Sequence, residues 1–214
     1  MSVNTIVLTG KNGAGKDTRL AKFMEKNHAK YQVMGMSDLL RKVKETDPQL
    51  WGTIERIMKE GGLVPDEIIL HLVAEELKSA TKTVICNGFP RTDVQAKAMV
   101  AMGHKPDAVV ELHVDDDVVV QRAKDRIICS KCKKPYTLNE FNPPKVEGVC
   151  DDCGAPLVKR EDDEESIVRK RLAQYNEQTP AILEILIGAG AEYHRIDNNA
   201  PSAADSFEKV MKMY

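Results

Sequence analysis

The sequence predicts an α/β protein in which helices cover both faces of a five-stranded parallel sheet. Short runs rich in β-branched residues alternate with longer segments of helical period along the 214 residues. Parallel neighbours need a crossover connection, usually a helix, so this alternation favours a parallel sheet. The segment from about residue 129 to 163 breaks the alternation, and we interpret it as a small inserted unit.

Five short runs are expected to be strands. The first ends at a glycine cluster that begins with Gly10, and the third ends at Cys86, just before Gly88. A strand that is buried on both faces has a nearly continuous apolar sequence. The expected strands are residues 5–9, 31–36, 83–86, 108–114 and 193–196.

Helical segments lie between these strands, and turn residues mark their ends. A helix that Ser37 or Asp38 can cap runs toward Thr46 and stops before Asp47-Pro48. Pro65 is well placed to open a helix that has acidic residues in its first turn. The expected helices are residues 18–26, 38–46, 50–59, 66–78, 92–102, 115–126, 164–187 with a break near Pro180, and 202–213.

Composition excludes several classes of protein. A hydrophobic fraction of 42% with 30% charged residues is ordinary for a globular chain and too apolar for a disordered one. The 31 basic residues are balanced by 33 acidic ones, which argues against a nucleic-acid partner. No apolar run reaches about 18 residues, so no membrane partner is expected. Residues 1–10 lack the basic stretch of a signal peptide, and we expect a cytoplasmic protein.

A glycine-rich loop, Gly10-Lys-Asn-Gly-Ala-Gly15-Lys16, joins an expected strand to an expected helix. Its glycines let backbone N–H groups point inward at a phosphate, and the helix N-terminus adds partial positive charge. Lys16 can reach the terminal phosphates of a nucleotide. The alternative is a glycine-rich turn with a solvent-exposed lysine. The strand–loop–helix context favours a phosphate-binding loop, and with it a P-loop NTPase core.

The residue after this lysine departs from the common pattern. P-loops often place Ser or Thr there, and the hydroxyl meets Mg²⁺. This chain has Asp17, followed by Thr18. An acid suits the first turn of a helix but would repel a nearby anion. Asp17 is therefore either turned aside from the ligand or in contact with Mg²⁺, directly or through water, and both interpretations stay open.

Four of the five cysteines form two pairs, Cys129-x₂-Cys132 and Cys150-x₂-Cys153, separated by seventeen residues. Each pair can occupy a tight turn, and four thiolates can close a tetrahedron around a structural Zn²⁺. An insertion of about 35 residues buries little core, so a metal would replace that core. Free thiols or a disulfide are the alternatives. Cys86 stands alone, and we interpret it as a small buried residue in a strand.

Further motifs follow in a fixed order along the chain. They are Gly62-Leu-Val-Pro-Asp-Glu67, Gly88-Phe-Pro-Arg91-Thr-Asp-Val-Gln95, Phe141-Asn-Pro-Pro-Lys-Val-Glu-Gly148 between the cysteine pairs, Arg160-Glu-Asp-Asp163, and Val168-Arg-Lys-Arg171-Leu. Together with the P-loop they resemble the adenylate kinase family in its long-lid form, which has a zinc-binding lid. The resemblance covers essentially the whole chain.

The resemblance implies phosphoryl transfer from ATP to AMP, giving two ADP, with Mg²⁺ bound to ATP and a structural Zn²⁺ in the lid. It implies a P-loop core of residues 1–34, 65–127 and 164–214, an AMP-binding domain of residues 35–64, and a lid of residues 128–163 that closes over ATP. The expected partners are ATP, AMP and ADP, and the expected oligomeric state is a monomer.

The resemblance also implies roles for individual residues. The cations that would stabilise the transferring phosphoryl group are Lys16, Arg91, Arg126, Arg160 and Arg171. The expected ATP contacts are Gly13, Ala14, Gly15, Lys16, Asp17, Thr18, Arg122 and Tyr136. The expected AMP contacts are Met36, Arg41, Val64, Gly88, Arg91, Gln95, Arg160 and Arg171. The four paired cysteines, Cys129, Cys132, Cys150 and Cys153, would hold the metal.

The chain departs from the family pattern at several positions. Asn87 stands where the motif normally reads Asp-Gly-Phe-Pro-Arg, and that Asp helps to organise Mg²⁺ through its waters. We hypothesise that Asp17 partly compensates for the carboxylate missing at Asn87. Met36 replaces a usual Thr near the AMP base, so a preference for UMP or CMP is an alternative. The changes at the Mg²⁺ site make a catalytically weak nucleotide-binding module a second alternative.

Overall fold

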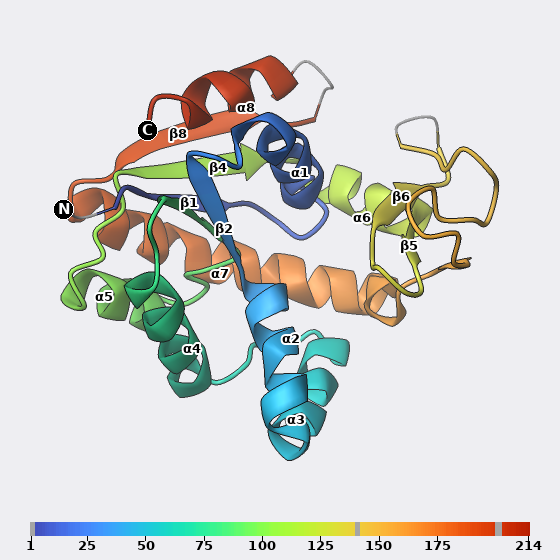
Figure 1. Ribbon diagram of the computed structural model, residues 1–214, viewed down its shortest axis with the longest axis horizontal. Coiled ribbons are helices and arrows are strands. Elements are labelled where there is room, and N and C mark those ends of the chain that lie inside the picture. The colour runs from blue at the N-terminus through green and yellow to red at the C-terminus, as the bar shows by residue number, and fades with distance from the viewer. Residues whose placement is uncertain (1–2, 140–141, 200–202) are drawn as a thin grey trace.

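Five parallel strands form the central sheet of the computed structural model, which describes residues 3–139, 142–199 and 203–214 (Figure 1). The spatial order is β2-β3-β1-β4-β8. The predicted five-stranded parallel sheet is confirmed. Its strands are β1 (Thr5–Thr9), β2 (Tyr31–Gly35), β3 (Thr83–Asn87), β4 (Ala108–His113) and β8 (Glu192–Asp197).

Alternate residues of the central strand β1 supply two separate cores. Ile6 and Leu8 are fully buried on one face of the sheet, in a cluster that contains Phe23 and Phe207. Val7 is buried on the other face, in a cluster that contains Met99. Side chains alternate across a strand, so a strand between two helical layers must be apolar at every position. This explains why β1 has a continuous apolar sequence.

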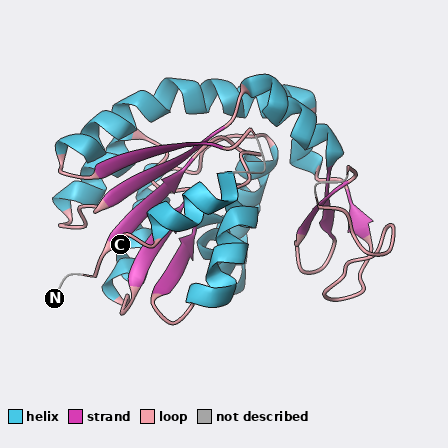
Figure 2. Ribbon diagram, turned by 90° about the horizontal axis from the view of Figure 1, so that it is seen from above, coloured by secondary structure: helices cyan, strands magenta, loops and turns pink. Residues whose placement is uncertain are grey.

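Helices cover both faces of the sheet, as Figure 2 shows. Most of their boundaries agree with the predicted ranges to within two or three residues. Asp47 caps one helix by accepting a hydrogen bond from the Leu50 amide, and Pro48 is the first residue of that helix. The predicted start of the last helix at Ser202 lies outside the described residues. The helices are α1 (Lys16–Asn27), α2 (Met36–Thr46), α3 (Pro48–Lys59), α4 (Asp66–Lys78), α5 (Asp93–Ala101), α6 (Asp116–Asp125), α7 (Glu165–Gly188) and α8 (Ala203–Met211).

The predicted break near Pro180 is wrong, because α7 continues through this residue without interruption. A proline inside a helix removes one backbone hydrogen bond and crowds the carbonyl four residues earlier. Here the nearby residues Thr179 and Ile182 are buried, so tertiary packing holds the helix together across the missing bond. In Figure 1, α7 is the long orange helix that runs from near the chain termini to the inserted unit.

The inserted unit contains a short antiparallel sheet of its own, with the order β6-β5-β7. Its strands are β5 (Arg126–Cys129), β6 (Pro135–Thr137) and β7 (Leu157–Val158), and a single 3₁₀ turn, Glu161–Asp163, leads into α7. Figure 2 shows this small sheet standing apart from the parallel sheet. Its core is small, consisting of Ile127, Tyr136 and two of the cysteines, with Ala155 and Leu157 packed against them.

The connections that follow the carboxyl ends of the parallel strands carry all the predicted nucleotide-binding motifs. The glycine-rich loop follows β1, the α2–α3 pair follows β2, and the motif at Gly88 follows β3. In parallel α/β sheets this edge is where ligands bind. Within the described ranges, no helix is both long enough and apolar enough to cross a membrane.

Candidate active site and metal centre

The glycine-rich loop between β1 and α1 has the backbone geometry that its sequence predicts. Gly10 has φ 142°, and a Cβ there would lie 2.6 Å from the Leu112 carbonyl oxygen. Gly15, with φ 85°, caps the N-terminus of α1. Glycine is needed at both positions, because an L-residue would be strained there and because β4 approaches Gly10 closely. The loop therefore opens onto a helix N-terminus, as a phosphate site requires.

Lys16 folds back over the loop and does not extend into solvent. Its Nζ donates to the carbonyl oxygens of Gly10, at 2.5 Å, and of Lys11, at 3.0 Å. Burial lowers the pKa of Lys16 to about 8; Asp17 opposes this shift, and Arg91 and Arg126 add to it. Three of the predicted catalytic cations thus lie close enough to influence one another electrostatically.

The two departures from the family pattern meet in space. Asn87, at the end of β3, donates from Nδ2 to Asp17 Oδ1 over 2.7 Å. The pKa of Arg160 is raised mainly by Asp162, with smaller contributions from Asp163 and Asp17, and the Asp17 carboxylate also acts to raise the pKa of Arg91 against desolvation. Asp17 therefore lies among the predicted catalytic cations. Carboxylate, amide and hydroxyl oxygens can ligate Mg²⁺ or accept hydrogen bonds from its bound waters, so this corner of the site fits that ion.

Carboxylates hold three of the predicted catalytic arginines, Arg126, Arg160 and Arg171, at the base of the inserted unit. Arg126 binds Asp163 through two nitrogens, with Nε at 2.8 Å. Arg160 binds both oxygens of Asp162, at 2.8 and 2.5 Å, and Arg171 reaches the same carboxylate at 2.7 Å. Burial would raise the pKa of Asp162, but Arg160 and Arg171 outweigh it and lower the pKa to about 2.

A pocket beside Arg91 brings together most of the residues predicted to contact AMP. Arg41 does not line it; its guanidinium forms an ion pair with Asp38 on the exposed face of α2. Arg91 lines this pocket, and its Nε donates to the Gly88 carbonyl oxygen at 2.8 Å, so the pocket has a cation at one end. The predicted AMP contacts in its wall are Met36, Val64, Gly88, Arg91 and Gln95.

Gln95 is 3% exposed, and both polar atoms of its amide have partners. Oε1 accepts from the Arg91 backbone N–H at 2.7 Å, and Nε2 donates to Asp66 at 2.7 Å. Asp66 is a residue that the sequence interpretation did not select for the site. The amide orients the loop that carries Arg91, and its predicted contact with the adenine of AMP stays a prediction.

The remaining predicted ATP contacts separate into two groups. Gly13, Ala14, Gly15 and Thr18 lie in the loop and the first turn of α1, and Arg122 of α6 lies beside them, with Nη1 3.4 Å from the Gly13 carbonyl oxygen. Tyr136 lies in the core of the inserted unit, where it is 2% exposed. Its hydroxyl accepts from the Asp151 amide at 2.8 Å and lies 3.4 Å from Cys150 Sγ. In this arrangement its side chain faces the cysteine cluster.

Two polar residues beside the P-loop were not among the predicted site residues, although one of them, Asn198, belongs to the turn that in the family pattern contains a glycine and lies near the ATP adenine. Asn198 is 3% exposed and follows β8, and Arg19 lies in the second turn of α1 and contacts it. A second signal in the sequence was position, because Asn198 follows the carboxyl end of a parallel strand, where ligands bind.

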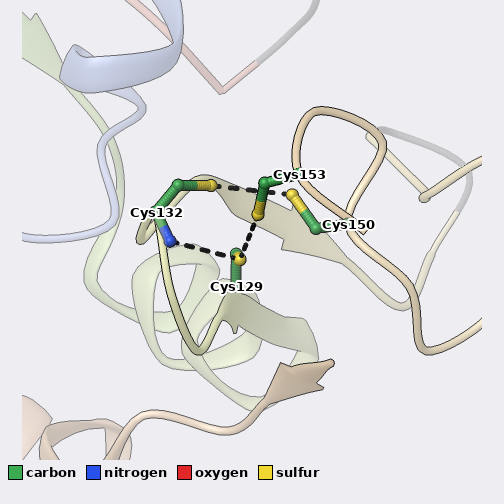
Figure 3. Close-up of side chains that lie close together, drawn as sticks. All are labelled: Cys129, Cys132, Cys150 and Cys153. Carbon is green, nitrogen blue, oxygen red and sulfur yellow. Dashed lines mark hydrogen bonds between the residues drawn. The ribbon is translucent and has the colours of Figure 1, made fainter. Parts of the chain in front are cut away.

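Four sulfur atoms gather between β5 and the loop before β7 (Figure 3). The Sγ atoms of Cys129 and Cys153 lie 3.4 Å apart, those of Cys132 and Cys150 lie 3.6 Å apart, and all four lie within 4.8 Å of one another. A tetrahedral zinc with Zn–S bonds of about 2.3 Å would separate its sulfurs by about 3.8 Å. A disulfide would need about 2.05 Å, and all four cysteines are free thiols.

The two cysteine pairs occupy equivalent turns. The Lys133 amide donates to the Cys129 carbonyl oxygen at 3.2 Å, and the Gly154 amide donates to the Cys150 carbonyl oxygen at 2.9 Å. Both donors have positive φ, 63° and 69°, so the chain reverses in the same way after each pair. This repeated turn aims two sulfurs from each pair at one point, which is the arrangement that a four-coordinate metal requires. The predicted cluster is present and can hold a metal ion.

Cys86 differs from the paired cysteines. It is fully buried in β3, and burial raises its pKa to about 12, so it stays a protonated thiol packed in the core.

Comparison with known proteins agrees with this geometry. The sequence profile of the family described as "Adenylate kinase" matches residues 8–189. An adenylate kinase of Fervidobacterium nodosum is 37% identical over 97% of this chain and 94% of its own length. An adenylate kinase of Thermosipho africanus is 39% identical over 84% of this chain and 85% of its own length. An adenylate kinase of Lachnospira eligens is 34% identical over 97% of this chain and 98% of its own length. Similarity over nearly the whole length covers the fold, the P-loop and the inserted unit together, and the chain therefore belongs to the adenylate kinase family of nucleotide phosphotransferases.

Proposed function

We propose that this protein catalyses the reversible, Mg²⁺-dependent transfer of the γ-phosphoryl group of ATP to AMP, giving two ADP. A phosphate oxygen of AMP attacks the γ-phosphorus, and the bond to the β-phosphate oxygen breaks, so ADP forms on both sides and water takes no part. The observation that carries the proposal is the position of Arg91, which lines the pocket that contains Met36 and Gln95 and lies close enough to the P-loop lysine to lower its pKa.

Charge stabilisation is the main task of the protein in such a reaction. Lys16 and the loop amides would bind the β- and γ-phosphates, and Arg91 would hold the acceptor phosphate. Arg126, Arg160 and Arg171 now bind Asp162 and Asp163. A guanidinium can exchange a carboxylate for phosphate oxygens with similar geometry, so these pairs keep the arginines oriented until nucleotide arrives.

Mg²⁺, when bound with ATP, neutralises phosphate charge and orients the terminal phosphates. The residues that would hold its waters are Asp17, Asn87 and Thr18. Asn87 positions the Asp17 carboxylate through the 2.7 Å hydrogen bond from its Nδ2, and the side-chain carbonyl oxygen of Asn87 can accept a hydrogen bond from a water.

Two parts of the chain would close over the core when the nucleotides bind. Residues 35–64 would close over AMP and residues 128–163 over ATP, and the closed site would exclude water as a competing acceptor. We propose Zn²⁺ as the metal that the four cysteines hold, because four thiolates in a closed tetrahedron suit that ion. Free thiols suit a reducing compartment, so we place the enzyme in the cytoplasm, and we expect a monomer.

The test is ADP formation from ATP and each of AMP, GMP, CMP and UMP, measured with zinc-loaded protein. The proposal expects AMP to be the best acceptor by a wide margin. Met36 is 5% exposed in the wall of the acceptor pocket, and it is the feature that favours the alternative base preference. Faster transfer to CMP or UMP would move the assignment to that alternative, and background rates with all four would identify a binding module.

A further inference from the structure

Asn198 joins the P-loop to a cluster of two arginines. It is 3% exposed and lies directly after β8. Its Nδ2 donates to the Ala14 carbonyl oxygen of the P-loop at 2.5 Å. Its Oδ1 accepts from Arg19 twice, from Nε at 3.1 Å and Nη2 at 2.9 Å. A carbonyl can only accept and a guanidinium can only donate, so these partners fix the orientation of the amide.

The backbone of the same residue adds two further contacts. Its carbonyl oxygen accepts from Arg122 Nη2 at 2.8 Å, and its N–H donates to the His113 carbonyl oxygen at the end of β4 at 2.8 Å. One buried residue therefore links the P-loop, α1, α6 and β4.

The side chain also packs against the last glycine of the loop. A Cβ at Gly15 would lie 3.0 Å from Asn198 Nδ2. The amide thus touches the loop at the N-terminus of α1, where phosphate would bind, and a shift of Asn198 would move the loop.

Bringing two guanidinium groups together carries an electrostatic cost. Burial lowers the pKa of Arg122, and the neighbouring Arg19 lowers it further. The two positive charges of Arg19 and Arg122, held next to each other beside the P-loop, would be stabilised by an electron-rich ligand. Guanidinium planes stack on the faces of aromatic bases, and their charge attracts phosphate.

From these contacts we infer that Asn198 is a positioning residue of the ATP subsite, which fixes the Ala14 carbonyl together with the guanidinium groups of Arg19 and Arg122. ATP would then meet a preformed surface for its base and phosphates, and less order would be lost on binding. The inference rests on the proposed function, because it assumes that the P-loop nucleotide is ATP. AMP would bind in the pocket at Gln95, which Asn198 does not line.

The test is direct binding of Mg-ATP and of AMP, each alone, to the full chain carrying Asn198→Ala. Loss of the amide frees the loop and Arg19 together, so we expect the Kd for ATP to rise about tenfold and the Kd for AMP to change less than about twofold. The matched control is Asn27→Ala, because Asn27 also donates to a backbone carbonyl, that of Phe23 at 2.7 Å, but lies at the other end of α1. The control should leave both Kd values unchanged.

Arg19→Ala is the second variant. It removes the hydrogen bonds between Arg19 and Asn198 Oδ1 but keeps the buried Asn198 amide. It should produce the same selective loss of ATP affinity, and the double variant should be no weaker than about the worse single variant. Equal weakening of ATP and AMP, or a lower Tm with an unchanged Kd for ATP, would overturn the inference. Because ATP binding is measured without AMP, failure of the wild-type protein to make ADP would overturn only the proposed function.

Discussion

At the scale of single residues, the contact between Asp17 and Asn87 makes the hypothesis of compensation testable. The 2.7 Å hydrogen bond couples the carboxylate that this chain has to the position where the family pattern has one. Asp17→Gly should weaken binding of Mn²⁺, a probe for Mg²⁺, to the protein–ATP complex. Asn87→Asp should restore it in the Asp17→Gly background and help less in the wild type, since two adjacent carboxylates repel. We expect a coupling free energy of about 1 kcal/mol, and strictly additive effects would contradict the hypothesis.

The pKa of Lys16 predicts a proton linked to nucleotide binding. Between about pH 8 and its ordinary pKa of 10.5, the folded protein binds fewer protons at this lysine than the unfolded chain does. The lysine therefore costs stability at lower pH, and the cost disappears as the pH rises through this window. Phosphate favours the charged amine, so ATP binding at about pH 9 should take up a proton and weaken as the pH rises.

Calorimetry in two buffers of different ionisation enthalpy would measure this uptake. Lys16→Met should remove the buffer dependence. An ATP binding enthalpy that is the same in both buffers for the wild type would show that Lys16 is already charged.

At this scale, the sequence predicts the roles of residues that must lie at fixed intervals along the chain. The glycines of the P-loop and the paired cysteines are such residues, because a turn or a tetrahedron requires a fixed interval. The resemblance places the turn that contains Asn198 near the ATP adenine. The contacts of its side chain could not be predicted, because its partners Ala14, Arg19 and Arg122 are distant in sequence and a backbone carbonyl has no sequence signature.

At the scale of elements, the inserted unit depends on its cysteines because its apolar core is small. Four buried residues, two of them cysteines, form that core. Removing the metal should unfold the unit, since binding free energy replaces core burial in small metal domains. A chelator should lower the Tm and speed amide exchange in residues 128–163, while exchange in β1 and β4 stays slow. Unchanged exchange in the unit after verified metal loss would contradict this prediction.

The inner strands β1, β3 and β4 are predictable because burial on both faces forces a nearly continuous apolar sequence, whereas the edge strand β8 is mostly exposed and polar. The break at Pro180 was wrongly predicted because the local cost of proline is offset by packing around Thr179 and Ile182, which a local pattern does not contain. The small strands β5 to β7 were missed for a related reason. They are two to four residues long, too short for a period of alternation to be recognised.

At the scale of the whole molecule, the near-neutral net charge conceals a concentrated cationic site. The net charge of −2 argues against a basic surface, yet Lys16, Arg91 and Arg126 lie close enough to shift one pKa together. These cations come from the P-loop, the loop after β3 and the start of the inserted unit. The order of motifs along the chain indicated that they would converge, but only the fold shows which carboxylates hold them now.

Contacts from α7 reach both the C-terminal end of α3 and the base of the inserted unit, which are the two parts that we expect to move. Arg171 of α7 donates to the Met58 carbonyl oxygen at 2.8 Å, and Lys170 donates to that of Glu60 at 2.9 Å. Arg171 also binds Asp162 at the base of the inserted unit, so one side chain touches both parts. Replacing Arg171 with Met should lower kcat by about a hundredfold or more while the Kd for AMP alone changes much less, because the lost charge acts mainly in the transition state. Equal losses in kcat/KM and in AMP affinity would assign Arg171 to ground-state binding.

The central claim is that the γ-phosphoryl group passes directly from ATP to AMP. The most direct measurement follows ¹⁸O-labelled γ-phosphate by ³¹P NMR in a mixture of labelled ATP, AMP, Mg²⁺ and zinc-loaded protein. We predict that the label appears in the β-phosphoryl group of ADP, at a rate that requires AMP. Label that appears in inorganic phosphate, at a rate independent of AMP, would contradict the account.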